Sequence, residues 1–256
     1  MAPIERPTLI RGAAAALSTP VLLGMAPIFG KLALFTGVDA FTVAALRTLL
    51  AVLLLWLTYL LFARRFIFIY PAGLLGCLVI GTINGIGSLF YYSGLSLLDA
   101  SLVQLINGLY LALAVLLSRI GGQRASTRTL IRVLLAMAAL LLITSLGAGL
   151  NWTGVGLMLG SALMFAGTVI LSQYVLYEMP APTATLYILT TMGVVVTVVW
   201  LALSPTLEAS MLQAAFWPIF LLGLTTALSR LAMFSGIKFL GGMQTAVLAI
   251  AEIGVA

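Results

Sequence analysis

The decapeptide LFYYSGLSLL, residues 89–98, returns as LAMFSGIKFL at residues 231–240. Both copies have leucine at each end and the pair serine–glycine in the middle, and they lie 142 residues apart. The same offset, without a gap, aligns Gly12 with Gly154. Because a fixed offset is typical of an internal repeat, the sequence predicts a chain built from two related units.

The composition places both units in a lipid membrane. Of the 256 residues, 63% are hydrophobic and 7% are charged, and the mean hydropathy is +1.24. In a soluble domain about 25% of the residues are charged. The apolar runs also lack the alternation of apolar and polar residues that the strands of a membrane barrel need. We therefore expect an all-α protein that crosses the membrane several times.

Apolar segments of about 20 residues, the length needed to span a bilayer, recur along the chain. We expect eight complete membrane helices, at residues 10–34, 40–63, 72–97, 100–119, 128–148, 153–177, 182–203 and 214–240. A ninth apolar run begins at Gly242. The joins between these runs are short and contain turn residues or charges, so the pattern predicts no soluble domain.

The repeat also predicts how the two units are related. Residues 1–150 would form the first five-helix unit and residues 151–256 the second. An odd number of helices places the second copy upside down, which gives the inverted repeat of many secondary transporters. At the same offset Ala256 falls on Ala114, so the second unit lacks the counterpart of residues 115–150. We therefore expect a chain that is truncated within its ninth helix.

Basic residues in the joins predict the orientation. With the N-terminus in the cytoplasm, only Lys31 falls at an outer helix end, and nine other basic residues fall in or next to the cytoplasmic joins. These are Arg6, Arg11, Arg64, Arg65, Arg119, Arg124, Arg128, Arg132 and Lys238. Cytoplasmic loops carry the excess of Lys and Arg in membrane proteins. We therefore expect a multi-pass protein of the cytoplasmic (inner) membrane with a cytoplasmic N-terminus.

Several classes of function are excluded by the residues that the chain lacks. It has no histidine and a single cysteine, Cys77, which excludes a disulfide framework, a Cys/His metal site and catalysis by histidine. We expect Cys77 to be a small core residue. No basic cluster has the length or the aromatic content of a nucleic-acid site. We expect no cofactor, and the expected partners are a small-molecule substrate and membrane lipid.

Two stretches of the repeat resemble a known family. They are YYSGLSLLDASLVQLINGLYLALAVLLSR, residues 91–119, and its echo FSGIKFLGGMQTAVLAIAEIGVA, residues 234–256. Both are similar to segments of the EamA-like group in the drug/metabolite transporter superfamily, which has ten helices in two five-helix repeats. In that family a Glu-Pro pair is often found in the second repeat. Here Ile253 follows Glu252, and Leu111 stands where proline is common in the first repeat.

Charged residues within the spans are candidates for chemistry, because a charge at the centre of a membrane helix costs about 2.5–3.5 kcal/mol. Arg230 could clamp an anionic group of a substrate or form an ion pair with Glu252. Glu252 could bind a proton or a cationic group during transport, or it could only neutralise Arg230. Arg47 lies near the outer end of its helix, where it could bind substrate, reach the surface or pair with Asp39.

Neutral polar residues form two further candidate groups. Asn84, Ser88 and Tyr91 recur at helical spacing in one span, and so do Gln104, Asn107 and Tyr110 in the next. Their spacing places each group along one helical face, where it could line an amphipathic pocket. The alternative is hydrogen bonding between helices, which contributes on average only about 0.6 kcal/mol.

The resemblance implies a secondary transporter that exports amino acids or related metabolites by alternating access. A flippase for lipids or lipid-linked sugars is the alternative in the same superfamily, and it would need an opening to the bilayer. A membrane-embedded enzyme is disfavoured, because the spans contain neither paired carboxylates nor a nucleophile next to a base.

Overall fold

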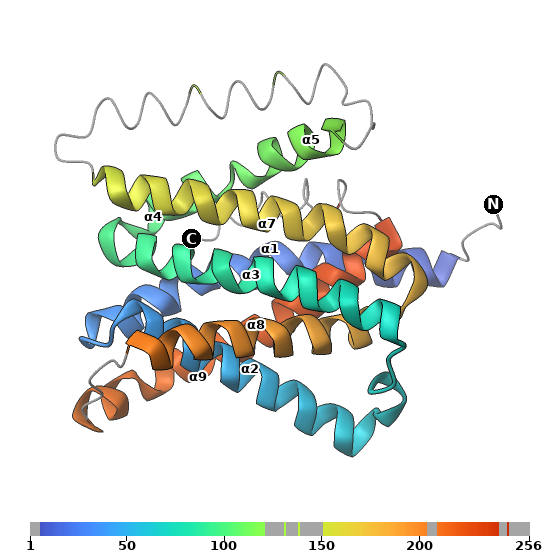
Figure 1. Cartoon of the computed structure of the whole chain (residues 1–256), viewed down its shortest axis with the longest axis horizontal. Helices are drawn as coiled ribbons and strands as arrows, with labels where there is room; N and C mark the ends of the chain where they lie inside the picture. The colour runs from blue at the N-terminus through green and yellow to red at the C-terminus, as the bar shows by residue number, and fades with distance from the viewer. Residues whose placement is uncertain are drawn as a thin grey trace.

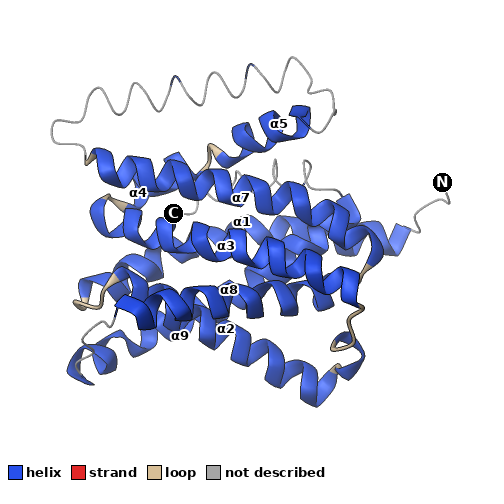
Figure 2. Ribbon diagram, in the orientation of Figure 1, coloured by secondary structure: helices blue, strands red, loops and turns tan. Residues whose placement is uncertain are grey.

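The computed structural model describes residues 6–120, 151–203 and 209–240, together with Ile131, Ala138 and Thr245. Every regular element in these residues is helical (Figure 2). The elements are α1 (Arg6–Phe35), α2 (Ala40–Phe62), the short 3-10 helix η1 (Arg64–Phe66), α3 (Pro71–Leu97), α4 (Ala100–Asn107), α5 (Tyr110–Ile120), α7 (Trp152–Glu178), α8 (Ala181–Leu203) and α9 (Ala209–Leu240).

Seven spans in the described part of the chain are long and apolar enough to cross a membrane. They coincide with seven of the predicted membrane helices, and the prediction of an all-helical membrane protein is confirmed. The helix predicted at 128–148 and the run that begins at Gly242 lie outside the described residues, apart from Ile131, Ala138 and Thr245.

One predicted helix is divided in two. Residues 100–119 form α4 and α5, with a turn at Gly108 and Leu109 between them. There the backbone tightens, because Leu109 N donates to Ile106 O (3.1 Å) and Leu111 N donates to Gly108 O (3.4 Å), each three residues back. Glycine is a poor helix former, and a stretch of 3-10 geometry within a helix often marks a hinge or local strain.

Capping side chains and a turn glycine define the ends of several helices. The carboxylate of Asp39 accepts hydrogen bonds from Phe41 N (2.9 Å) and Thr42 N (3.0 Å) at the start of α2, which satisfies backbone donors that the helix leaves free. Asn151 caps α7 in the same way through Gly154 N (3.1 Å). Gly37, with φ of +89°, makes the tight turn between α1 and α2.

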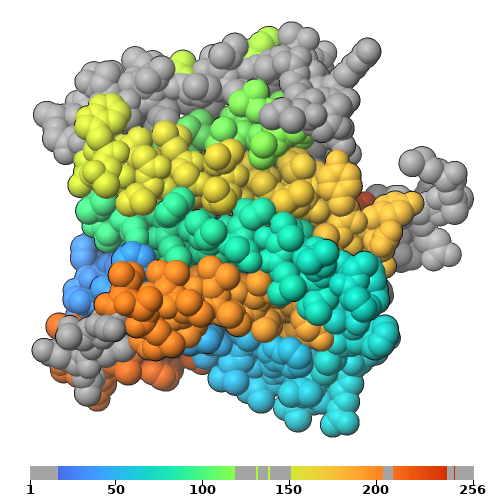
Figure 3. Space-filling model, in the orientation of Figure 1, coloured from blue at the N-terminus to red at the C-terminus, as the bar shows by residue number. Residues whose placement is uncertain are grey.

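The helices lie roughly parallel or antiparallel to one another in one bundle (Figure 1). α1 contacts α9 along its length, α3 lies against α7 and α8, and α2 lies against α8 and α9. In Figure 3, α7, α3, α8 and α2 follow one another as bands across one face of the molecule. The largest contacts are thus between helices that are far apart in the sequence.

The outer surface of the bundle is apolar. Leu61 on α2, Leu75 on α3 and Val198 on α8 are 69%, 64% and 60% exposed. Side chains of this kind face lipid in a membrane protein. Polar residues such as Arg47 and Gln104 are instead buried inside the bundle.

Candidate functional site

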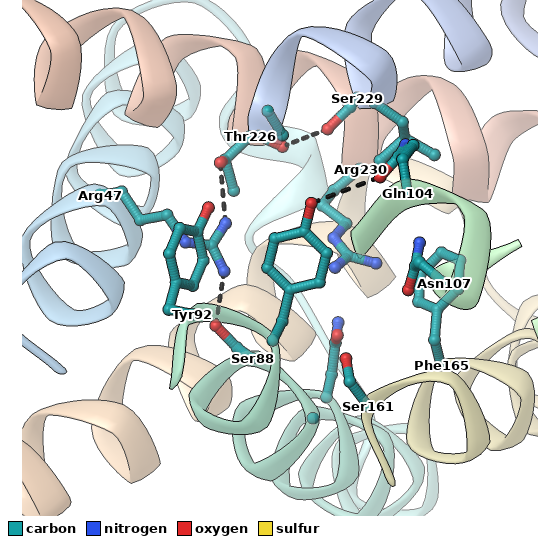
Figure 4. A pocket seen from close by; sticks show the side chains of 15 residues that line it. Arg47, Ser88, Tyr92, Gln104, Asn107, Ser161, Phe165, Thr226, Ser229 and Arg230 are labelled. Carbon is teal, nitrogen blue, oxygen red and sulfur yellow. Dashed lines mark hydrogen bonds between the residues drawn. The ribbon is translucent and has the colours of Figure 1, made fainter. Parts of the chain in front are cut away.

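A cavity of about 70 Å³ lies inside the bundle, between α1, α2, α3, α4, α7 and α9 (Figure 4). Its wall combines arginine, amide, hydroxyl and aromatic side chains. The lining residues are Leu23, Ala26, Arg47, Asn84, Gly87, Ser88, Tyr91, Tyr92, Gln104, Asn107, Ser161, Phe165, Thr226, Ser229 and Arg230. A polar wall inside an apolar bundle is the arrangement expected of a binding site within a membrane protein.

Arg47 projects from α2 into this cavity and is only 5% exposed. Its Nη1 donates to Thr226 Oγ1 (2.9 Å) on α9, and its Nη2 donates to Ser88 Oγ (2.6 Å) on α3. The ring of Tyr92 lies 4.6 Å from the guanidinium carbon. All these partners are uncharged, and within the described part of the chain the buried Nε has no acceptor.

Asp39 is not the partner of Arg47. Its carboxylate caps α2 through Phe41 N and Thr42 N, and it also accepts the hydroxyl of Thr42. Arg47 does not reach the surface either, because its side chain turns inward between α3 and α9. Arg47 therefore neither pairs with Asp39 nor reaches the surface. It lies buried in the cavity wall.

Arg230 enters the same cavity from α9 and is 9% exposed. Its guanidinium carbon lies 5.1 Å from the centre of the Phe165 ring, and its Nη1 lies 4.0 Å from Met233 Sδ. In Figure 4 the side chains of Arg47 and Arg230 extend toward the same space from opposite sides. Glu252 lies outside the described residues, so its pairing with Arg230 and its role in coupling stay predictions.

The two predicted groups of neutral polar residues meet at the cavity. Asn84, Ser88 and Tyr91 of α3 line it together with Gln104 and Asn107 of α4. They meet directly where Tyr91 OH donates to Gln104 Oε1 (3.4 Å). Most residues of both groups thus belong to one wall, as their spacing predicts.

Tyr110 differs from this prediction. It is fully buried at the start of α5 and lies edge-on against Phe165, with 4.7 Å between ring centres. It does not line the cavity. The turn at Gly108 and Leu109 interrupts the helical spacing, so Tyr110 no longer shares a face with Asn107.

Other lining residues were not predicted. Thr226 and Ser229 are two of them. Ser229 and the predicted Arg230 follow Thr226 by three and four residues, so one face of α9 carries all three. That spacing was available in the sequence and could have identified them. Tyr92 and Phe165 gave no such signal, because an aromatic residue in an apolar span most often serves only in packing.

The fold and the cavity define the class: a multi-pass membrane protein with a polar site inside its helical bundle. The sequence model of the EamA-like transporter family matches residues 10–145, which is more than half of the chain. The chain therefore belongs to the EamA-like transporter family.

The comparison with solved structures agrees with this fold. One crystal structure, described only as that of a protein, is similar with a TM-score of 0.54 and 18% sequence identity. The match covers 93% of this chain and 90% of that one. At this identity the likeness concerns the fold alone. None of the curated proteins that were compared matches the chain.

Proposed function

We propose that the protein is a secondary transporter that exports a small organic metabolite, such as an amino acid or a related compound, across the cytoplasmic membrane. The observation that carries this proposal is the buried polar cavity with two arginines in its wall. Membrane proteins keep ionisable residues at such depth mainly on the paths of substrates and ions. Membership of a transporter family adds to this support.

The proposed mechanism is alternating access between two inverted halves, residues 1–150 and 151–256. The cavity wall supports this relation, because several of its residues are 142 positions apart. These pairs are Leu23 and Phe165, Asn84 and Thr226, Gly87 and Ser229, and Ser88 and Arg230. Each half would thus offer equivalent positions to one central site, which is where substrates bind in transporters with inverted repeats.

The contacts between helices support the same relation. The repeat makes α7, α8 and α9 the counterparts of α1, α2 and α3. Exchanging the halves converts the α1–α9 contact into the α7–α3 contact, and the α2–α9 contact into the α8–α3 contact. All four of these contacts are among the larger ones of the bundle.

In this proposal Arg47, Arg230, Asn84, Tyr91, Gln104 and Asn107 bind the substrate in the cavity, and Glu252 couples transport to a proton or a cation. The division between α4 and α5, next to Asn107, fits a binding role, because interrupted helices commonly form the sites of transporters. The N-terminus lies in the cytoplasm, and the substrate is a small molecule rather than a nucleic acid.

Flux into proteoliposomes tests the proposal. The purified protein is reconstituted and assayed with a panel of radiolabelled amino acids and related metabolites. We expect saturable uptake of at least one compound, reduced at least about tenfold by Arg230→Met, because an arginine that holds substrate contributes more than 1.4 kcal/mol. Arg64→Met, which removes an exposed cation bound to Leu60 O, is the control and should transport normally.

If no compound of the panel shows saturable flux, the result contradicts the proposal. A parallel assay measures the transfer of fluorescent lipid between the leaflets of the same vesicles. Transfer of lipid in place of soluble metabolites would support the flippase alternative.

A further inference from the structure

We infer that the cavity binds a carboxylate group of the transported molecule and that Arg47 supplies the positive charge that holds it. This inference rests on the proposed transport function, whose site it makes more specific. It assigns a class of ligand, a carboxylate, to one part of the cavity. This subsite is formed by Arg47 on α2 and by Asn84 and Ser88 on α3.

The first argument is the charge of Arg47. Its hydrogen-bond partners, Thr226 and Ser88, are hydroxyls, and its aromatic partner is Tyr92. A buried charge is expensive unless an opposite charge accompanies it. Within the described residues the guanidinium has no carboxylate partner. A bound anion would supply the missing negative charge.

The second argument is an excess of donors at the same place. Among the described residues, Arg47 Nε and Asn84 Nδ2 are buried without an acceptor. Ser88 Oγ accepts from Arg47, and its own proton is donated to no described residue. Three donors without protein acceptors favour a ligand rich in acceptors, and a carboxylate offers two oxygens with about four acceptor positions.

The third argument concerns the neighbouring residues. Thr226 accepts from Arg47 and donates its own proton to Leu222 O (2.6 Å). The guanidinium is thus fixed by two hydroxyls that are themselves neutral and do not compensate its charge. This preorganised arrangement favours a charged ligand that completes it.

A matched pair of small probes separates charge from shape. Sodium propionate and propionamide have nearly the same size, but only propionate is an anion. The thermal unfolding of the purified protein in detergent is followed with each probe, at constant ionic strength because salt screens charges. We expect propionate to raise Tm in a saturable way and propionamide to leave it unchanged.

Two substitutions remove the subsite by opposite routes. Arg47→Met deletes the cation, and Ser88→Asp places a carboxylate next to Arg47, whose Nη2 already lies 2.6 Å from Ser88 Oγ. Each should weaken propionate binding about 30-fold or more, because one member of a charge pair is lost or already occupied. The unliganded Arg47→Met protein should unfold at the same temperature or a higher one, since it no longer buries an uncompensated charge.

Arg64→Met is the control, because it removes an exposed arginine at the start of η1, and this arginine does not line the cavity. It should respond to propionate like the native protein. If Arg47→Met fails to fold, Ser88→Asp and the control still decide the outcome.

Several results would overturn the inference. They are equal responses to propionate and propionamide, a response to inorganic phosphate without one to propionate, and a response that Arg47→Met and Ser88→Asp leave intact. Saturable flux that does not depend on Arg47 would also overturn the subsite, while leaving the transport function standing. Propionate binding that depends on Arg47, in a protein without any flux, would support the subsite and contradict the transport function.

Discussion

Glycines decide how closely α3 can approach its neighbours. A Cβ on Gly81 would lie 2.5 Å from Thr191 Cβ and 2.7 Å from Ile188 O of α8. A Cβ on Gly94 would lie 2.7 Å from Met158 Sδ of α7. Small residues at such positions let the backbones of membrane helices come together, and the gain is close contact over the whole interface. Gly81 and Gly94 thus place α3 between α7 and α8, with Asn84 and Ser88 toward the cavity.

Gly81→Ala should therefore destabilise the protein. The added methyl group meets the backbone oxygen of Ile188, which cannot move aside as a side chain can, so we expect a loss of about 1–3 kcal/mol. The measurement is unfolding by titration with SDS from a mild detergent. Gly156→Ala on α7 is the control: among the described residues no atom of another part of the fold lies within 4 Å of its added Cβ, and we expect a gain of about 0.5–1 kcal/mol from helix propensity. Equal effects of the two substitutions would contradict the close approach at Gly81.

Among the helices, two lysines each connect the helix that carries them to the C-terminal end of another helix. Lys31 of α1 donates to Leu95 O and Leu98 O, both at 2.8 Å, at the C-terminal end of α3. Lys238 of α9 donates to Met179 O (2.6 Å) and to Leu176 O (3.3 Å) at the C-terminal end of α7. The last carbonyls of a helix have no partner within it, and the helix dipole favours a cation there. Each lysine therefore ties its own helix to a neighbour.

Replacing either lysine by methionine should loosen these ends. Lys31→Met and Lys238→Met each leave two carbonyls without their donor, and we expect a loss of about 1 kcal/mol for each. The double variant should show the sum, because the two sites share no partner. Unfolding in SDS measures both effects. Arg65→Met, an exposed cation near Phe66, is the control, and a similar loss there would mean that the effect belongs to net charge.

Hydropathy predicted the membrane helices but missed the turn that divides one of them. Continuous apolar runs predicted α2 and α3 to within one residue, because lipid requires an unbroken apolar stretch of that length. The run from Ala100 to Ser118 is equally continuous, yet it contains the turn at Gly108. Hydropathy cannot detect such a turn, because glycine and its apolar neighbours fit the same lipid environment. The position of Tyr110 could not be predicted for that reason.

The whole molecule brings together charges that the sequence shows separately. Arg47 and Arg230 were predicted as candidates because a charge in an apolar span is conspicuous. That they share one cavity depends on how α2, α3 and α9 meet, which no local pattern contains. The predicted repeat was the only long-range signal in the sequence, since its offset of 142 aligns Ser88 with Arg230. The hydroxyl partners of Arg47 followed only from the contacts between helices.

The proposed inverted repeat leads to a prediction about the two ends of the bundle. Phe35 ends α1 and Tyr177 lies in the last turn of α7, and they are equivalent positions at the same offset. α1 and α7 run in opposite directions (Figure 1). Both side chains are exposed, at 76% and 90%. Cysteine at either position would be accessible to a reagent, while the native Cys77 is fully buried and stays in place.

We expect a membrane-impermeant maleimide to label Phe35→Cys in intact cells and to label Tyr177→Cys only after the cells are permeabilised. The reason is that an inverted repeat would place equivalent positions on opposite sides of the membrane, and the excess of basic residues predicts that the N-terminus is inside. The native chain, with Cys77 alone, should remain unlabelled in both conditions. Labelling of both variants from one side would contradict the inverted repeat. The opposite pattern, with Tyr177→Cys labelled from outside, would keep the inversion and reverse the orientation, so that the basic residues at the helix ends would no longer explain how the chain enters the membrane.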